Sequence, residues 1–147
     1  MTDFSVTRDI DAPVPDVWDI VSRPQLALYW YPSALERRVV TPGPIGRGTV
    51  IRHSDRILGR VLEQAHEIVE FVPGSRYRGR TIGGPFSYEY GLYLTAVGSR
   101  TRVTVTASAS SGFAGFFGWF TDAVVTGAAR RQLETALRTL QLGIENE

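Results

Sequence analysis

The strongest constraint on the fold is the order of two sequence patterns. A long stretch of alternating strand pattern fills the later middle of the chain, and one helix-forming segment from about Phe113 to Ile144 follows it. A helix of that length cannot bury its apolar side alone, and the only sheet available to it is the one that precedes it. A curved antiparallel sheet wrapped on a long helix often leaves a cavity between the two. Binding of a small molecule is therefore the first hypothesis.

Seven stretches carry a strand pattern, in which apolar and polar residues alternate between turns rich in glycine and proline. In the last of them Val103, Val105, Ala107 and Ala109 share one face, which we expect to be the inner one. The expected strands cover residues 4–10, 35–40, 49–54, 57–71, 76–82, 86–96 and 101–109.

Two short helices are expected between the first and second strands. Val14, Val17, Trp18 and Val21 have the i, i+3, i+4, i+7 spacing of one helical face. Pro24 ends that helix, because proline cannot continue the hydrogen-bond ladder of a helix interior. A second short helix is expected over residues 25–30.

The C-terminal segment carries apolar residues on two roughly opposite faces, so one straight helix cannot turn both toward the same sheet. We predict a main helix over about 122–144, with Thr121 as its N-cap, whose buried face holds Leu133, Leu137 and Leu140. An aromatic segment interrupted by glycine is expected before it at 112–120. The functional interpretation of that segment is an apolar lid or a membrane-docking patch, and the structural one is an aromatic plug in the core.

Composition excludes several kinds of chemistry. The 147 residues contain no cysteine, which excludes disulfides and thiol nucleophiles, and all 16 basic residues are arginine, which excludes Schiff-base lysines. The net charge of +1 argues against a nucleic acid partner. Neither a signal peptide nor a membrane-spanning run is visible, so we expect a cytoplasmic protein without stable membrane insertion, as a monomer or a homodimer.

Four motifs, joined to the order of the elements, resemble a known family. They are Ile10-Asp11-Ala12-Pro13 with Val17-Trp18, Gly46-Arg47-Gly48-Thr49, Glu67-Ile68-Val69-Glu70-Phe71-Val72-Pro73 and Arg100-Thr101-Arg102-Val103-Thr104. The chain resembles the helix-grip proteins of the SRPBCC and START-like superfamily, which include birch-pollen-allergen-like proteins, and is most similar to the polyketide cyclase/dehydrase-like branch. The resemblance spans essentially the whole chain.

The resemblance implies an α+β fold in a single domain, residues 1–147. A curved seven-stranded antiparallel sheet would wrap around a long C-terminal helix, with two short helices after the first strand. Members of the superfamily include carriers, cyclases and chaperone activators. The family has no universal catalytic motif, so no catalytic residue is implied and function has to be argued from the site.

Both histidines are predicted to face the interior. In the fourth strand Glu63 and Glu67 share a face that should meet solvent, which turns Gln64 and His66 inward. On the third strand the family resemblance favours His53 as inward. A histidine can act as a general base near neutral pH, although no third group that would orient it is evident. Two histidines without a well-placed carboxylate are an incomplete ligand set, so neither a metal nor a cofactor is expected.

Aromatic side chains are the other candidates for a ligand site. Tyr88 and Tyr90 share a face of the sixth strand and would form an aromatic wall whose hydroxyls orient a ligand. Packing as ordinary core is the alternative for them. The predicted ligand-binding residues are Trp30, His53, Gln64, His66, Tyr77, Tyr88, Tyr90, Phe113, Phe117 and Phe120.

Three function classes remain open. The leading hypothesis is a protein that binds a hydrophobic small molecule, such as a lipid, a polyketide or an aromatic metabolite, between the sheet and the C-terminal helix. The second is a polyketide cyclase or dehydratase, with His66 as general base and Tyr90 or Tyr88 as hydrogen-bond donor. The third is a protein-interaction module of the chaperone-activator type.

Overall fold

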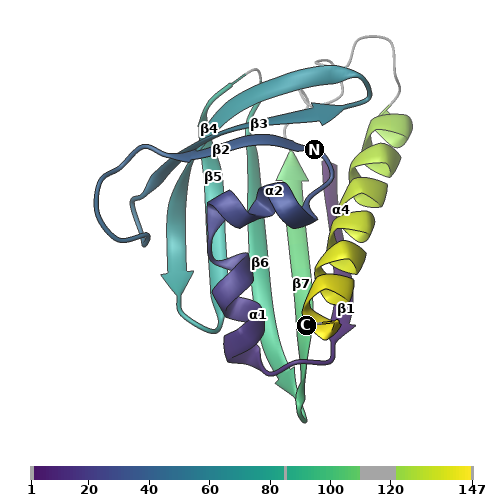
Figure 1. The fold of residues 1–147 in the computed structure, drawn as a ribbon. Helices are drawn as coiled ribbons and strands as arrows, with labels where there is room; N and C mark the ends of the chain where they lie inside the picture. Colours follow the sequence, from purple (N-terminus) through teal and green to yellow (C-terminus); the bar gives the residue numbers. More distant parts are fainter. Residues whose placement is uncertain (1, 85, 110–121, 147) are drawn as a thin grey trace.

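The computed structural model describes residues 2–84, 86–109 and 122–146 (Figure 1). Seven strands, two short helices, one 3-10 turn and one long helix are found there. In chain order they are β1 Thr2–Ile10, α1 Val14–Val21, η1 Pro24–Leu26, α2 Ala27–Trp30, β2 Ala34–Val39, β3 Val50–Ile57, β4 Arg60–Val72, β5 Arg76–Gly83, β6 Tyr88–Val97, β7 Arg100–Ala109 and α4 Asp122–Glu145.

The strands form one antiparallel sheet in the order β1-β7-β6-β5-β4-β3-β2. The first strand of the chain therefore pairs with the last, while β2 to β7 follow one another across the sheet. Figure 1 shows the sheet curling, with β2 passing close to α2, with α1 beside β6, and with α4 running alongside β7 and β1. This arrangement is the helix-grip fold, as predicted.

The core lies between the concave face of the sheet and the helices. Ile10, Ile51, Ile68 and Val103 supply its sheet side and are fully buried. The C-terminal part of the buried face of α4 meets them, and most members of that face lie three or four residues from the next, as in an amphipathic helix. The members of that face are Val125, Ala128, Leu133, Ala136, Leu137, Leu140 and Ile144.

The predicted strand faces are confirmed by burial. Leu62, Gln64, His66 and Ile68 of β4 point inward and are all less than a tenth exposed, whereas Glu63 on the opposite face is exposed. The alternating set of β7 that contains Val103 and Val105 is likewise buried. These two strands thus turn alternate side chains toward the cavity side of the sheet.

The connection between the third and fourth strands was predicted wrongly, whereas the other strand ends differ from the prediction by no more than two residues. The third strand was expected to end at residue 54 and the fourth to begin at 57, but β3 continues to Ile57 and a tight turn at Leu58 and Gly59 leads into β4. Both turn residues have positive φ, 50° and 79°, as a two-residue hairpin turn of the primed type requires. Leucine is rare in that conformation, so the sequence carries no ordinary turn signal there.

The long helix begins at Asp122, where the main helix was predicted to start. The expected N-cap Thr121 and the aromatic segment 112–120 lie outside the described residues. Within the part of the chain that the structure describes, none of the helices has the length and apolar character needed to span a bilayer.

Replacing Leu137 with Ala should destabilise the protein by about 2–5 kcal/mol, because Leu137 is fully buried where α4 meets the sheet and the truncation leaves a cavity. Urea denaturation gives the free energy of unfolding. Leu142→Ala is the matched control, because Leu142 lies on the same helix with 54% of its surface exposed. Equal losses in the two variants would contradict a core built on this face of α4.

Candidate functional site

A cavity of about 220 Å³ lies between the concave face of the sheet, the η1–α2 region and α4. Its walls are mostly apolar, with Leu92 and Val105 from the sheet and Leu133 from α4 among them. The volume is below the roughly 300–1,000 Å³ of drug-sized ligand sites but above the roughly 150 Å³ cavity that holds benzene. The cavity therefore suits a compact ligand.

One end of the cavity is polar, and Asp55 lies at its centre. The carboxylate is buried, and its Oδ1 accepts hydrogen bonds from Ser33 Oγ at 2.9 Å and from Arg37 at 3.0 Å. Its Oδ2 lies 3.2 Å from Nδ1 of His53. Arg37, Asp55 and His53 all line the cavity. This buried ion pair is fully engaged by polar neighbours, which is the condition for keeping charges away from water.

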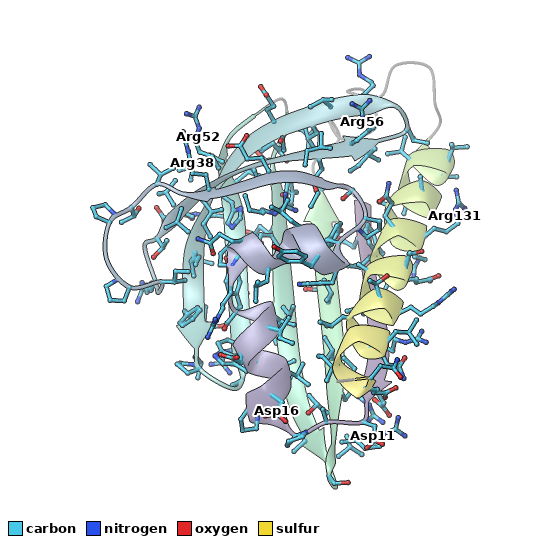
Figure 2. The ribbon with its side chains drawn as sticks, in the orientation of Figure 1. Asp11, Asp16, Arg38, Arg52, Arg56 and Arg131 are labelled. Carbon is cyan, nitrogen blue, oxygen red and sulfur yellow. The ribbon has the colours of Figure 1, made fainter. Side chains whose placement is uncertain are left out.

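The pairing of β2 with β3 brings these groups together. Arg37 lies directly opposite His53 in the register, and Asp55 follows His53 by two residues on the same inward face. The next position on each strand points the other way: Arg38 and Arg52, also paired in register, are exposed. Figure 2 shows both of them directed away from the curled sheet.

We call the polar end of the cavity, formed by Arg37, Asp55 and His53, the polar wall, and it continues from His53 to Tyr88. A carboxylate can only accept, so His53 Nδ1 donates to Asp55 and His53 Nε2 is left as an acceptor. The hydroxyl of Tyr88, 3.2 Å from Nε2, is the donor to it. Burial alone would raise the pKa of Asp55, but the hydrogen bond from His53 and the charge of Arg37 outweigh it and lower that pKa to about 2. Burial raises the pKa of Tyr88, which keeps its proton.

A second group of polar side chains surrounds His66. Its Nε2 lies 2.6 Å from the hydroxyl of Tyr90 and 3.4 Å from that of Tyr77, while its Nδ1 is buried without a hydrogen-bond partner among the described residues. Burial lowers the pKa of His66 to about 3, helped by the charge of Arg37, so the ring is neutral at physiological pH. The two histidine rings are 4.9 Å apart between centroids.

A glycine allows Tyr90 to reach His66. Tyr90 is on β6 and His66 is on β4, so the tyrosine has to cross the intervening β5. It crosses at Gly79, its direct partner in the β5–β6 register. A Cβ atom at position 79 would lie 2.8 Å from the ring and hydroxyl of Tyr90, closer than such contacts allow. Because Gly79 has no side chain, the Tyr90 ring can lie flat on the sheet, where it forms part of the cavity wall.

Most of the predicted site residues within the described part of the chain line this one cavity. The structure brings together Trp30, His53, His66, Tyr77, Tyr88 and Tyr90. Trp30 adds an unused donor, because its indole Nε1 is buried with no hydrogen-bond partner among the described residues. Phe113, Phe117 and Phe120 lie outside those residues.

Gln64 is not brought to the cavity, although it faces inward. Its Nε2 donates to the backbone oxygen of Phe86 at 3.0 Å, and its side chain packs against Gly84. Gln64 therefore fastens the turn between β5 and β6. The inward direction of Gln64 alone could not distinguish a ligand-binding role from this structural role.

The sequence prediction missed Ser33, Arg37 and Asp55. The third strand was expected to stop at residue 54, so Asp55 was not recognised as the next inward position after His53. Asp55 is the orienting group that had seemed to be missing, and it orients His53 rather than His66. The Arg37–Asp55 pair also places two charged groups in the cavity wall.

The curled sheet, the long helix that it grips and the cavity between them define a protein of the helix-grip type. A family model described as polyketide cyclase/dehydrase and lipid transport matches residues 1–145. The chain belongs to this family. A comparison with curated proteins finds no match.

Solved structures agree with this fold. Protein TTHA0849 of Thermus thermophilus is 19% identical with a TM-score of 0.81, over 99% of this chain and 98% of its own. A START superfamily protein of Mycobacterium smegmatis is 17% identical with a TM-score of 0.79, over 98% and 97%. The Zhui aromatase/cyclase of Streptomyces is 14% identical with a TM-score of 0.78, over 98% and 93%. Identities this low establish the fold alone.

Replacing Gly79 with Ala should cost about 1–3 kcal/mol of stability and break the contact between Tyr90 and His66, because the new methyl group occupies the place of the tyrosine ring. Denaturation and the ring ¹⁵N signals of His66 measure the two effects. Gly83→Ala is the control, since it lies on the same strand with open space around it. An unchanged His66 spectrum in the Gly79 variant would contradict the crossing.

Acid should destabilise the protein from about pH 6.5 downward. The pKa of His66 is 6.5 when unperturbed and about 3 in the fold, so between those values the unfolded chain binds the proton and the folded protein does not. Stability is then lost as pH falls, by at most about 1.4 kcal/mol per pH unit, and Asp55 adds a loss below its ordinary 3.8. Urea melts from pH 7 to 4 measure this slope, and His66→Gln should flatten it. A flat wild-type profile would show that His66 is not desolvated.

Proposed function

We propose that the protein binds a compact, uncharged ring compound in this cavity, with a hydroxyl or carbonyl group at the polar wall. One observation carries the proposal: an apolar cavity of about 220 Å³ ends in a defined set of hydrogen-bonding groups. Sites for small molecules commonly combine apolar walls with a few such polar groups. Membership of a family described as cyclase, dehydrase and lipid transport supports a hydrophobic ligand.

The size of the cavity favours one or two rings. It exceeds the roughly 150 Å³ that accommodates benzene and falls short of the roughly 300 Å³ where drug-sized sites begin. A long acyl chain needs far more space than this. Among the lipids, polyketides and aromatic metabolites expected from the sequence, the cavity therefore favours a small aromatic compound.

The charges of the cavity favour an uncharged ligand. Of the lining residues that the structure describes, the two arginines both have carboxylate partners, Arg37 with Asp55 and Arg23 with Asp19. A ligand carboxylate would lose its hydration without gaining a cation of its own, which is costly in an apolar site. A neutral hydroxyl or carbonyl loses less and finds partners at Tyr88 and at Trp30 Nε1.

Filling the cavity should weaken binding while leaving the fold intact. Ala107 lines the cavity from β7, and Ala107→Leu should weaken the binding of 2-naphthol by at least about tenfold through loss of space. Quenching of tryptophan fluorescence, with Trp30 in the wall, measures the affinity, and native mass spectrometry of protein from its own host looks for a bound molecule. Ala65→Leu is the control, since Ala65 lies on the outer face of β4. Binding of palmitate but not of 2-naphthol would overturn the proposal.

Acid–base catalysis in the same cavity is the second candidate function. The hydrogen bond of 2.6 Å between Tyr90 and His66 supports it, because it places a proton donor and a basic nitrogen side by side. The low pKa of His66 keeps its nitrogen free of protons but makes it a weak base at neutral pH. An interaction module of the chaperone-activator type receives less support, because its main sequence feature, the 112–120 segment, lies outside the described residues.

A further inference from the structure

Three side chains form a continuous line of hydrogen bonds that ends in the cavity. Asp55 and His53 are both more than nine-tenths buried, and His53 Nδ1 lies 3.2 Å from the carboxylate. On the other side of the ring, Nε2 lies 3.2 Å from the hydroxyl of Tyr88. His53 and Tyr88 both line the cavity, so a bound ligand can meet this line at its open end.

The direction of the protons along the line is fixed by its first member. Asp55 is held as an acceptor by Arg37 and Ser33, so His53 directs its Nδ1 proton to Asp55 and turns a lone pair toward Tyr88. The Tyr88 hydroxyl then donates to His53, which leaves its oxygen lone pairs free to accept a proton from a ligand. An oriented histidine with a carboxylate behind it is the arrangement that general bases require.

We propose that Asp55, His53 and Tyr88 form a proton-transfer site that enolises a compact ring ketone bound in the cavity. This inference rests on the proposed function, because it names a reaction and a substrate class for the same site. His53 and Tyr88 are its catalytic residues, and Asp55 is a positioning residue.

The reaction moves one proton and needs no other reactant. A C–H bond next to the ketone carbonyl breaks, and its proton passes to the Tyr88 oxygen while the proton of Tyr88 passes to His53 Nε2. The electron pair of the C–H bond forms the C=C bond of an enolate, whose oxygen takes the negative charge. Asp55 stabilises the imidazolium that results, and return of a proton to carbon restores the ketone and the resting site.

The unused donor of Trp30 fits the same reaction. Its Nε1 is buried at the cavity wall without a partner among the described residues, and a buried donor left unpaired is costly. An enolate oxygen is a stronger acceptor than a ketone oxygen, so this donor would stabilise the charge that develops during enolisation.

His66 is less suited to the task than His53. The structure places tyrosine hydroxyls, not a carboxylate, at its Nε2, and its Nδ1 has no described partner that would fix the tautomer. An imidazolium at His66 would therefore lack the compensating charge that Asp55 gives to His53.

The test is deuterium exchange of 1-indanone, a two-ring ketone, in D₂O. Proton NMR follows the loss of signal from the protons on the carbon next to the carbonyl group. Fluorescence quenching measures binding of the same compound. The wild-type protein should accelerate exchange over buffer. His53→Gln and Tyr88→Phe should each lose about 100-fold or more of that acceleration. Tyr93→Phe is the control for Tyr88→Phe, since Tyr93 lies on the same strand away from this cavity.

The outcomes separate the two proposals. Binding of 1-indanone without accelerated exchange overturns the proton-transfer site and leaves the proposed function standing. Failure of both 1-indanone and 2-naphthol to bind overturns both. Exchange that survives His53→Gln but is lost in His66→Gln overturns the assignment to His53. Melting curves establish that each variant is folded.

The positioning role of Asp55 can be tested by a measurement that a purely structural role would leave unchanged, namely the tautomer of His53. The ring ¹⁵N spectrum of His53 should show the tautomer with the proton on Nδ1, and Asp55→Asn should reduce its population and slow exchange together. If that variant does not fold, Ser33→Ala, which removes one of the bonds that hold the carboxylate, should shift the same signals in the same direction. A His53 spectrum of the opposite tautomer in the wild-type protein would overturn the role of Asp55.

Discussion

The architecture depends on a mismatch of shape between one curled sheet and one helix. Seven strands enclose more space than α4 can fill, because α4 contacts mainly the β1 side of the sheet. The short helices α1 and α2 cover part of the remainder. What is left is the cavity, and its position under β3 to β7 follows from the strand order. Most inward side chains of those strands are thereby either core or cavity wall, which explains why the same alternation that builds the fold also builds the site.

The polar wall is stable because its members satisfy one another. A lone carboxylate or guanidinium in this place would be strongly destabilising, but Asp55 has three donors around it and Arg37 also donates to the backbone oxygens of Glu36 and Ser54. Among the described residues, three buried side-chain atoms have no hydrogen-bond partner, and two of them, Trp30 Nε1 and His66 Nδ1, belong to residues that line the cavity. Buried polar groups are usually paired, so unpaired ones at a cavity are the places where a ligand gains most.

Much of this arrangement follows from sequence patterns, and the failures have physical causes. Alternation placed His66 on the inner face, since a face with two glutamates has to meet solvent, and the family resemblance placed His53 there. The turn at Leu58 and Gly59 could not be predicted, because leucine rarely adopts positive φ, and the error in strand length hid Asp55. The role of Gly79 could not be predicted either. It depends on which residue of the neighbouring strand lies opposite, and that register is a property of the assembled sheet.

The placement of His53 and Asp55 two residues apart on one strand has a consequence for how the protein could exchange its contents. Their relative geometry is set by the pleat of β3 alone, whereas α2 and α4 form much of the opposite wall. Movements of those helices that admit or release a molecule would leave the carboxylate and the imidazole in place. The reactive end of the cavity would then be ready before each encounter, and no binding energy would be consumed in assembling it.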